Sequence, residues 1–306
     1  MSARPLSEFL YGANPVLAAL VANRRRILCA HVQTRAPGLI GKRAPPLRPE
    51  MAAILDLVRD RNIRVRTRDR YELDEMSQKR PHNGIVLETG PLPLETRLGL
   101  DRVADSDDAV WVYLHGIQDP QNLGAILRTC HYLGVTGVAV PTRNSADPSS
   151  AAVSKASSGA AELMVPHSLI LTNSGHGFVS ASRRNGWRVV AAARPPTSAS
   201  PSLTPSPGSA QLDASTNKRG PTLLVLGSEY KGISGPILDH VDEYAWIPPT
   251  TRNRSATTSS HDSSPLDRLL EEPVESLNVS VAAALLIGHV LGPTAAPVLQ
   301  SIATSI

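Results

Sequence analysis

The residues best suited to chemistry lie in three short segments that are far apart along the 306-residue chain. The first segment is Leu114-His-Gly-Ile-Gln-Asp-Pro-Gln-Asn-Leu-Gly-Ala-Ile-Leu-Arg128, in which a strand is expected to end at a glycine and a turn to lead into a helix. Gly124 and Arg128 are one helical turn apart and share a face. Glycine costs a helix about 1 kcal/mol relative to alanine, so its place beside an arginine indicates that another group approaches closely. The alternative is an ordinary strand-turn-helix with a surface arginine.

The second segment, residues 223–234, carries a buried strand into a loop that contains Glu229. Gly227 and Gly232 bound this loop, and glycines let backbone amides and carbonyls approach a ligand closely. The spacing is neither that of a dinucleotide fingerprint nor that of a P-loop. Taken alone, this segment is equally well explained as a plain turn from a strand to a helix.

The third segment, residues 275–288, places a polar loop before an apolar helix. Ser276 or Asn278 could simply cap the helix, because serine and asparagine are favoured at that position. The functional interpretation is that the backbone and side chains of the loop also meet a ligand.

Continuous apolar runs around these segments predict buried parallel strands covered on both faces, and therefore an α/β domain. These runs cover residues 110–114, 135–140, 187–192 and 222–226. We expect this domain to span residues 109–306, with disordered Ser-, Pro- and Thr-rich or polar insertions at about 195–220 and 250–272.

Residues 1–90 predict a smaller α/β domain, joined to the larger one by a proline-containing linker at 91–108. Helical patterns fall at Asn14–Ala22 and Met51–Arg61, with Asn14 as a possible cap. Strands are expected at residues 26–32, 63–67 and 84–88, the middle one half-buried because apolar residues alternate with arginine.

The charge distribution indicates that the smaller domain meets a polyanion. The chain carries a formal net charge of +4, but residues 1–90 hold 16 Lys and Arg against 9 Asp and Glu. Alternating arginines on a strand are presented on one face and suit phosphate groups. A solvated strand edge is the alternative. The candidate phosphate contacts are Arg24, Arg25, Arg26, Arg64, Arg66 and Arg68.

Composition argues against several other classes of protein. The two cysteines, Cys29 and Cys130, cannot build a disulfide framework, which favours a reducing compartment. The nine histidines show no zinc-type spacing with cysteine, so we expect no metal. No apolar run approaches the roughly 20 residues that a membrane span requires, so we expect no membrane partner.

In their order, the three segments closely resemble the motifs of the SpoU/TrmH class of SPOUT RNA methyltransferases. The matching residues are Asn122 and Arg128, then Gly227, Glu229 and Gly232, and then the Ser-Leu-Asn-Val-Ser string of residues 276–280. Residues 144–146 and 154–162 are similar to the segment between the first two motifs, and Tyr11–Val16 resembles the start of an N-terminal domain like ribosomal protein L30e.

This resemblance implies an α/β fold whose C-terminal part forms a trefoil knot, with a smaller L30e-like domain in front. It also implies that S-adenosylmethionine binds in the knot, held largely by loop backbone, and that the protein forms a homodimer through the knot domain. The cofactor contacts it implies are Leu226, Gly227, Ser228, Glu229, Gly232, Ile247, Pro248, Ser276, Leu277 and Asn278. The insertion after residue 250 separates loops that the family usually joins closely.

The reaction implied is methylation of a ribose 2′-oxygen in ribosomal RNA, with guanosine as the nucleoside. A guanidinium hardly ever loses its proton, so Arg128 is expected to stabilise the developing alkoxide or hold an adjacent phosphate. Asn122 and Glu229 would orient Arg128, and Ser276 and Asn278 would complete the pocket. Proton removal could pass to water or to an RNA phosphate.

The branch of the family that the N-terminal domain resembles acts on rRNA, and its eukaryotic members imply a mitochondrial location. Two alternatives remain open. One is a tRNA ribose methyltransferase of the same family, and the other is an RNA-binding ribosome-assembly factor that keeps the fold without activity.

Overall fold

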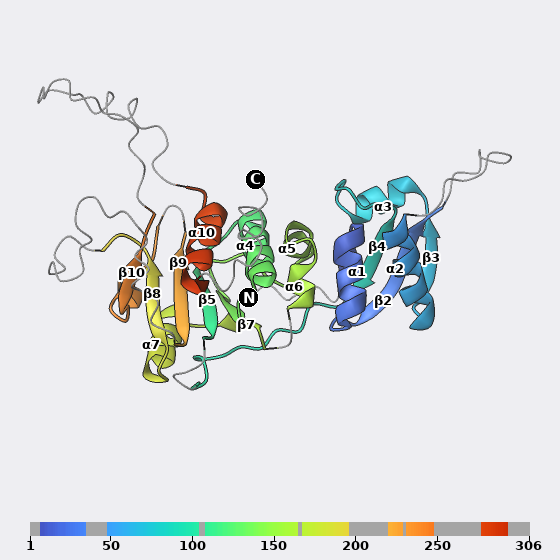
Figure 1. Ribbon diagram of the computed structural model, residues 1–306. Coiled ribbons are helices and arrows are strands. Elements are labelled where there is room, and N and C mark those ends of the chain that lie inside the picture. Colours follow the sequence, from blue (N-terminus) through green and yellow to red (C-terminus); the bar gives the residue numbers. More distant parts are fainter. Residues whose placement is uncertain are drawn as a thin grey trace, which may run out of the picture.

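The computed structural model describes residues 7–34, 48–103, 108–164, 167–195, 220–228, 231–247 and 277–292. Its two sheets belong to the two parts of the chain that the sequence separates (Figure 1). The predicted α/β class is therefore confirmed, with a smaller N-terminal domain and a larger C-terminal one.

The N-terminal domain is built on a mixed four-stranded sheet in the order β1-β4-β2-β3. Only the pair β2 and β3 is parallel. Leu10, Ala30 and Leu87 pack against helices α1 and α2, and Val86 packs against α3 on the other face. The elements are β1 (Glu8–Tyr11), α1 (Ala13–Ala22), β2 (Ile27–Gln33), α2 (Pro49–Asp60), β3 (Val65–Arg68), α3 (Arg70–Met76) and β4 (Ile85–Thr89).

Two details of this domain differ from the sequence expectation. Helix α1 begins at Ala13 with Gly12 at its cap position, rather than with Asn14 as its cap. Strand β3 is exposed rather than half-buried, and 52% of Val65 remains exposed. The reason is its place at the edge of the sheet, where only β2 pairs with it.

The C-terminal domain is a parallel six-stranded sheet in the order β10-β8-β9-β5-β6-β7, with helices on both faces. Strands β5 and β9 are buried almost throughout, which explains their continuous apolar runs. The strands are β5 (Val110–His115), β6 (Gly137–Pro141), β7 (Leu169–Thr172), β8 (Arg188–Ala192), β9 (Thr222–Gly227) and β10 (Glu243–Ala245).

Helices α4 and α10 cover one face of this sheet, and α7 and α8 cover the other. The first layer buries Leu123, Ile126 and Leu127 of α4 beside Ala283 of α10. The helices are α4 (Pro120–Leu133), α5 (Ala151–Ala156), α6 (Ala160–Leu163), α7 (Gly175–Arg184), α8 (Gly235–Leu238) and α10 (Val279–Leu291).

Helices α5 and α6 lie between α4 and the N-terminal domain (Figure 1). α6 packs against α1, and α5 packs against both α4 and β1. The predicted linker also follows the C-terminal domain: Leu92 and Leu100 are buried, and Thr96 pairs with Leu171 of β7. The short α5–α6 segment thus packs against the N-terminal domain on one side and against α4 on the other.

Several predictions lie outside the described residues. The two insertions fall there, apart from residue 195 and residue 220 at the ends of the first. The path of the chain through residues 229–230 and 248–276 would decide the trefoil knot, so the knot stays a prediction.

Candidate active site

The first motif forms the turn from β5 into α4 at the carboxyl edge of the parallel sheet. The Asp119 carboxylate caps the helix by accepting a hydrogen bond from the Gln121 amide at 2.9 Å, and Pro120 occupies the first turn. Gly116 has a φ of +74°, a conformation that favours glycine. Ligands of open α/β sheets bind at such a carboxyl edge, so this turn is where a site is expected.

The third motif meets the first through two asparagines. Asn278 Nδ2 donates a hydrogen bond to Asn122 Oδ1 at 3.1 Å. Asn278 Oδ1 also accepts from the Ser280 amide at 2.9 Å and so caps α10. The structural and functional interpretations of Asn278 are therefore both correct, because one side chain caps a helix and contacts the first motif.

The second motif lies beside the first because β9 pairs with β5, with Gly227 opposite His115. The loop folds back tightly: the Gly232 amide donates to the Ser228 carbonyl at 3.0 Å, and a Cβ at Gly227 would lie 2.4 Å from the Gly232 carbonyl carbon. A Cβ on Gly116 would lie 3.6 Å from Ser228 Cβ. Parts of all three motifs thus gather at one edge of the sheet.

The other residues predicted to contact the methyl donor differ in how deeply they are buried. Leu226 is buried in the core, and Ile247 packs against that core from a half-buried position. Leu277 directly precedes Asn278 and is 45% exposed. Glu229, Pro248 and Ser276 lie outside the described residues.

Arg128 projects from an exposed position on α4, and its Nη1 donates to Ser158 Oγ at 3.2 Å. Gly124, one turn earlier, does make room for a close neighbour, which is Ala156 of α5. Ser158 was not among the predicted site residues, although this serine lies in the segment 154–162 that resembles the family. No local signal marks it, because its contact arises from the packing of α5 against α4.

Two polar atoms near this edge are buried without a hydrogen-bond partner among the described residues: His115 Nδ1 and Ser145 Oγ. Burial also lowers the pKa of His115, which favours the neutral imidazole. Buried polar groups are nearly always satisfied. Unsatisfied polar atoms beside glycine-bounded loops therefore fit a polar ligand that would complete their hydrogen bonds.

Arg25 does not fit its predicted role as an RNA contact. Its side chain is fully buried, and its guanidinium donates to both carboxylate oxygens of Glu162 at 2.8–3.1 Å. It also donates to the carbonyls of Gly90 and Ser149. The prediction is wrong for Arg25, because this arginine joins the two domains and cannot reach a phosphate.

The other candidate arginines differ in how exposed their side chains are. Arg24 is half-buried and donates to the carbonyls of Met164 and Pro93, so it also belongs to the domain junction. Arg68 is bound to Glu72 at 2.6 Å. Arg26, Arg64 and Arg66 are exposed.

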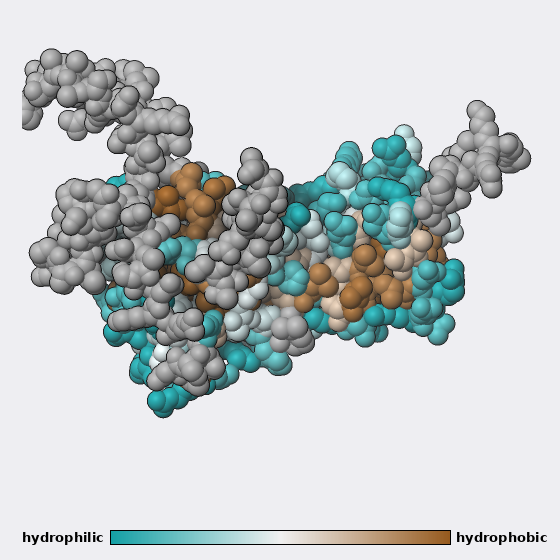
Figure 2. All heavy atoms as spheres, viewed as in Figure 1, coloured by the Kyte–Doolittle hydropathy of each residue, from teal (hydrophilic) through white to brown (hydrophobic). Residues whose placement is uncertain are grey.

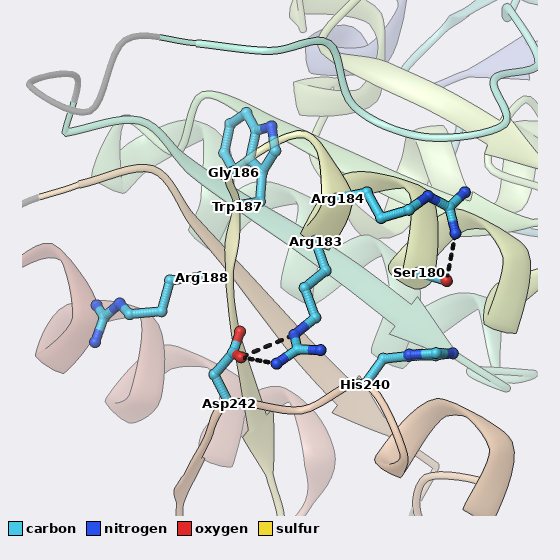
Figure 3. Close-up of a pocket in the computed structure, with 8 residues that line it drawn as sticks. All are labelled: Ser180, Arg183, Arg184, Gly186, Trp187, Arg188, His240 and Asp242. Atoms are coloured by element: carbon cyan, nitrogen blue, oxygen red, sulfur yellow. Dashed lines mark hydrogen bonds and ion pairs between the residues drawn. The ribbon is translucent and has the colours of Figure 1, made fainter.

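One pocket of about 680 Å³ lies away from these motifs (Figure 3). It lies at the amino edge of the parallel sheet, beside the C-terminal end of α7 and the start of β8, where Arg183 binds Asp242 at 2.8 Å. His115 and Gly227 lie at the opposite edge of the sheet, so this pocket is separate from the candidate site. Its lining residues are Ser180, Arg183, Arg184, Gly186, Trp187, Arg188, His240 and Asp242.

Within the described ranges, no cluster of three or more His, Cys, Asp or Glu side chains could hold a metal ion. Cys29 and Cys130 are free and buried, and burial raises the pKa of the Cys130 thiol to about 12. Among the same residues, no helix has both the length and the apolar character to cross a bilayer.

Comparison with protein families gives two matches in tandem. Residues 9–94 match the family model described as RNA 2′-O ribose methyltransferase substrate binding, and residues 109–256 match that of the SpoU rRNA methylase family. Human mitochondrial rRNA methyltransferase 1 is 35% identical over 92% of this chain and 71% of its own length. The Pseudomonas aeruginosa 23S rRNA (guanosine-2′-O-)-methyltransferase RlmB is 31% identical over 79% of this chain and 83% of its own.

Solved structures show the same fold at low identity. The AdoMet-bound rRNA methyltransferase from Sinorhizobium meliloti matches with a TM-score of 0.63 at 18% identity, over 93% of this chain and 87% of its own. The SpoU methyltransferase AviRb from Streptomyces viridochromogenes matches with a TM-score of 0.60 at 19% identity, over 94% and 90%. The family model over residues 109–256 and the 35% identity with the human relative show that the chain belongs to the SpoU rRNA methylase family.

Proposed function

We propose that this protein transfers the methyl group of S-adenosylmethionine to the ribose 2′-oxygen of a guanosine in large-subunit ribosomal RNA. The observation that carries the proposal is the hydrogen bond from Asn278 to Asn122, which joins the third motif to the first across 156 residues of chain. The names of the human and Pseudomonas relatives support the choice of rRNA, and that of the latter supports guanosine.

The donor would bind along the carboxyl edge of the sheet, against Leu226, Gly227 and Ser228, with Gly232 and Ile247 nearby. The support is that these loops are close to the first motif and that His115 Nδ1 and Ser145 Oγ are buried and unsatisfied there. The proposed set is completed by Glu229, Pro248, Ser276, Leu277 and Asn278. When bound, S-adenosylmethionine supplies a methyl group that its sulfonium has already activated.

Arg128 would hold the ribose 2′-oxygen or its neighbouring phosphate and stabilise the charge that develops on the oxygen. A guanidinium keeps its proton, so Arg128 acts as a fixed cation rather than as a base. Asn122, held by Asn278, would fix the start of α4 and the pocket wall next to the reacting ribose. The proton of the hydroxyl would leave to water or to an RNA phosphate.

RNA would lie across exposed arginines of the N-terminal domain. Arg66 is exposed on the edge strand β3, and Arg64 is exposed directly before this strand. Arg26 is exposed directly before β2. Phosphate contacts of this kind position an RNA without reading its bases. Arg24 and Arg25 are left out of this surface because the domain junction uses them.

We further infer that a second copy of the chain covers the outer face of α10. Val281 and Leu285 are 49% and 51% exposed one turn apart on the same face of α10, and Leu277, directly before the helix cap, is 45% exposed. Figure 2 shows a hydrophobic patch over this helix. This face begins beside Asn278, so the partner would adjoin the site. Analytical ultracentrifugation should find a dimer that Leu285→Glu converts to monomer; a monomeric wild type would contradict the inference.

The names of relatives from human, Dictyostelium discoideum and Saccharomyces cerevisiae support mitochondria as the place of action. The activity itself is tested by incubating the protein with methyl-labelled S-adenosylmethionine and transcripts of large-subunit rRNA or tRNA, followed by mapping of 2′-O-methyl nucleotides. We expect one methylated guanosine in rRNA only. Methylated tRNA alone would support the tRNA enzyme, and donor binding without transfer would support an inactive assembly factor.

A further inference from the structure

The turn at Ser157–Gly159, between α5 and α6, separates the helix that carries Arg128 from the N-terminal domain. On one side it packs against α4. A Cβ on Gly124 would lie 2.4 Å from Ala156 Cβ and 2.8 Å from the Ser157 amide nitrogen. Only a glycine at this position of α4 permits such a close approach. The approach places the Ser158 hydroxyl oxygen 3.2 Å from Arg128 Nη1.

On its other side the same turn packs against helix α1 of the N-terminal domain. A Cβ on Gly159 would lie 2.6 Å from Ala18 Cβ and 3.0 Å from the Asn14 carbonyl oxygen. Three residues further along α6, the fully buried Glu162 binds Arg25 of the N-terminal domain. Close packing and a buried ion pair thus fix the turn to the N-terminal domain.

The backbone of the turn has little freedom. Ser158 has a φ of +53°, which is uncommon for a residue other than glycine, and Gly159 has a φ of +88°, which glycine adopts readily. The Gly159 amide donates to the Ser154 carbonyl at 2.8 Å, and the Ser158 amide donates to the Lys155 carbonyl at 3.1 Å. The Ser158 hydroxyl is therefore presented to Arg128 from a rigid support.

We propose that Ser158 is a positioning residue for Arg128, and that the docked N-terminal domain holds Ser158 in place. A guanidinium has five N–H donors in a planar fork, so one bond to Ser158 orients the plane and leaves other donors for the substrate. The N-terminal domain would then both bind RNA and set the direction of the catalytic arginine. This inference rests on the role of Arg128 proposed above.

The test compares Ser158→Gly with Ser158→Asn. Glycine removes the hydroxyl and relieves the positive φ, whereas asparagine tolerates that conformation and keeps a side-chain acceptor. We expect Ser158→Gly to lower kcat by about tenfold, the size of one lost hydrogen bond to a charged group, with an unchanged KM for S-adenosylmethionine. Ser158→Asn should recover most of that loss, and both variants should melt within a few degrees of the wild type.

Each outcome separates this inference from the proposed function. If Arg128→Ala is inactive but Ser158→Gly turns over within about twofold of wild type, the positioning role is wrong and the role of Arg128 stands. If both Ser158 variants lose activity equally and melt early, the residue is merely structural, which also overturns the inference. Near-normal turnover by Arg128→Ala would instead refute the catalytic assignment itself.

Discussion

Asn278 Nδ2 lies 3.1 Å from Asn122 Oδ1, so the first turn of α4 and the cap of α10 are joined by a direct side-chain hydrogen bond. Helix capping alone would not require this contact, because Asn278 Oδ1 already caps α10 by accepting a hydrogen bond from the Ser280 amide. The side-chain amide nitrogen of Asn278 is thus left to connect the third motif to the first, beside the loop of the second motif.

The first prediction separates these two roles of Asn278. Serine is about as good a helix cap as asparagine but is too short to reach Asn122. Asn278→Ser should therefore keep the stability of the fold within about 0.5 kcal/mol while lowering methyl transfer at least tenfold, because the pocket wall loses its bridge. Urea denaturation and a single-turnover assay measure the two effects.

Asn278→Ala is the matched control, since it loses both the cap and the bridge and should cost roughly 1 kcal/mol of stability. Full activity of the serine variant would mean that the contact with Asn122 serves the fold alone.

The second prediction concerns the buried pair Arg25 and Glu162, which joins the domains. Removing one partner of a buried ion pair leaves an uncompensated charge and typically costs about 3–5 kcal/mol. Glu162→Gln should therefore lower the free energy of unfolding by about that amount in denaturant titrations followed by tryptophan fluorescence. The exposed pair Arg59–Asp56 supplies a control: Asp56→Asn should cost less than about 1 kcal/mol. Equal effects of the two substitutions would argue against a structural role for the buried pair.

The third prediction is that replacing a helical glycine by alanine lowers the stability of the protein, which is the opposite of the usual effect. Gly→Ala normally stabilises a helix by about 1 kcal/mol, but a Cβ at Gly124 would meet Ala156 and Ser157 at 2.4–2.8 Å. Gly124→Ala should thus destabilise the protein and displace α4 from α5. Gly235, at the start of α8, has open space around its Cβ position, so Gly235→Ala should be neutral or slightly stabilising. A stabilised Gly124→Ala variant would show that the two helices do not pack as described.

The fourth prediction addresses RNA binding by the edge strand. Replacing Arg64 and Arg66 by alanine should weaken binding for all RNA sequences alike. It should also reduce the slope of log affinity against log salt by about 1 for each lost phosphate contact. Arg184, exposed at the opposite edge of the C-terminal sheet (Figure 3), is the control, and its alanine variant should bind as the wild type does. Affinity that does not change with salt would contradict an electrostatic RNA surface.

The sequence predicted the long buried strands well, because β5 and β9 are continuous apolar runs that only a doubly covered parallel sheet explains. It missed β1, β7 and β10, which have only three or four residues and show no period of their own. It also misjudged β3, since a pattern of alternating residues does not reveal whether a strand lies at a sheet edge.

The site was predictable as a set of motifs but not as a set of contacts. The motif resemblance grouped Asn122 with Asn278. It did not reveal the role of Ser158, because that role depends on how α5 packs against α4. Arg24, Arg25 and Arg26 look alike in the sequence, yet the first is half-buried, the second fully buried and the third exposed. Burial of this kind follows from the docking of two domains, which no local pattern encodes.

The most direct test of the account measures two properties of Arg128→Ala: turnover on large-subunit rRNA and affinity for S-adenosylmethionine by calorimetry. The account predicts that methyl transfer is lost while donor affinity stays within about threefold of wild type, because loop backbone rather than Arg128 holds the donor. Methyl transfer at a near-normal rate by this variant would contradict the assignment of Arg128 as the group that stabilises the reacting oxygen.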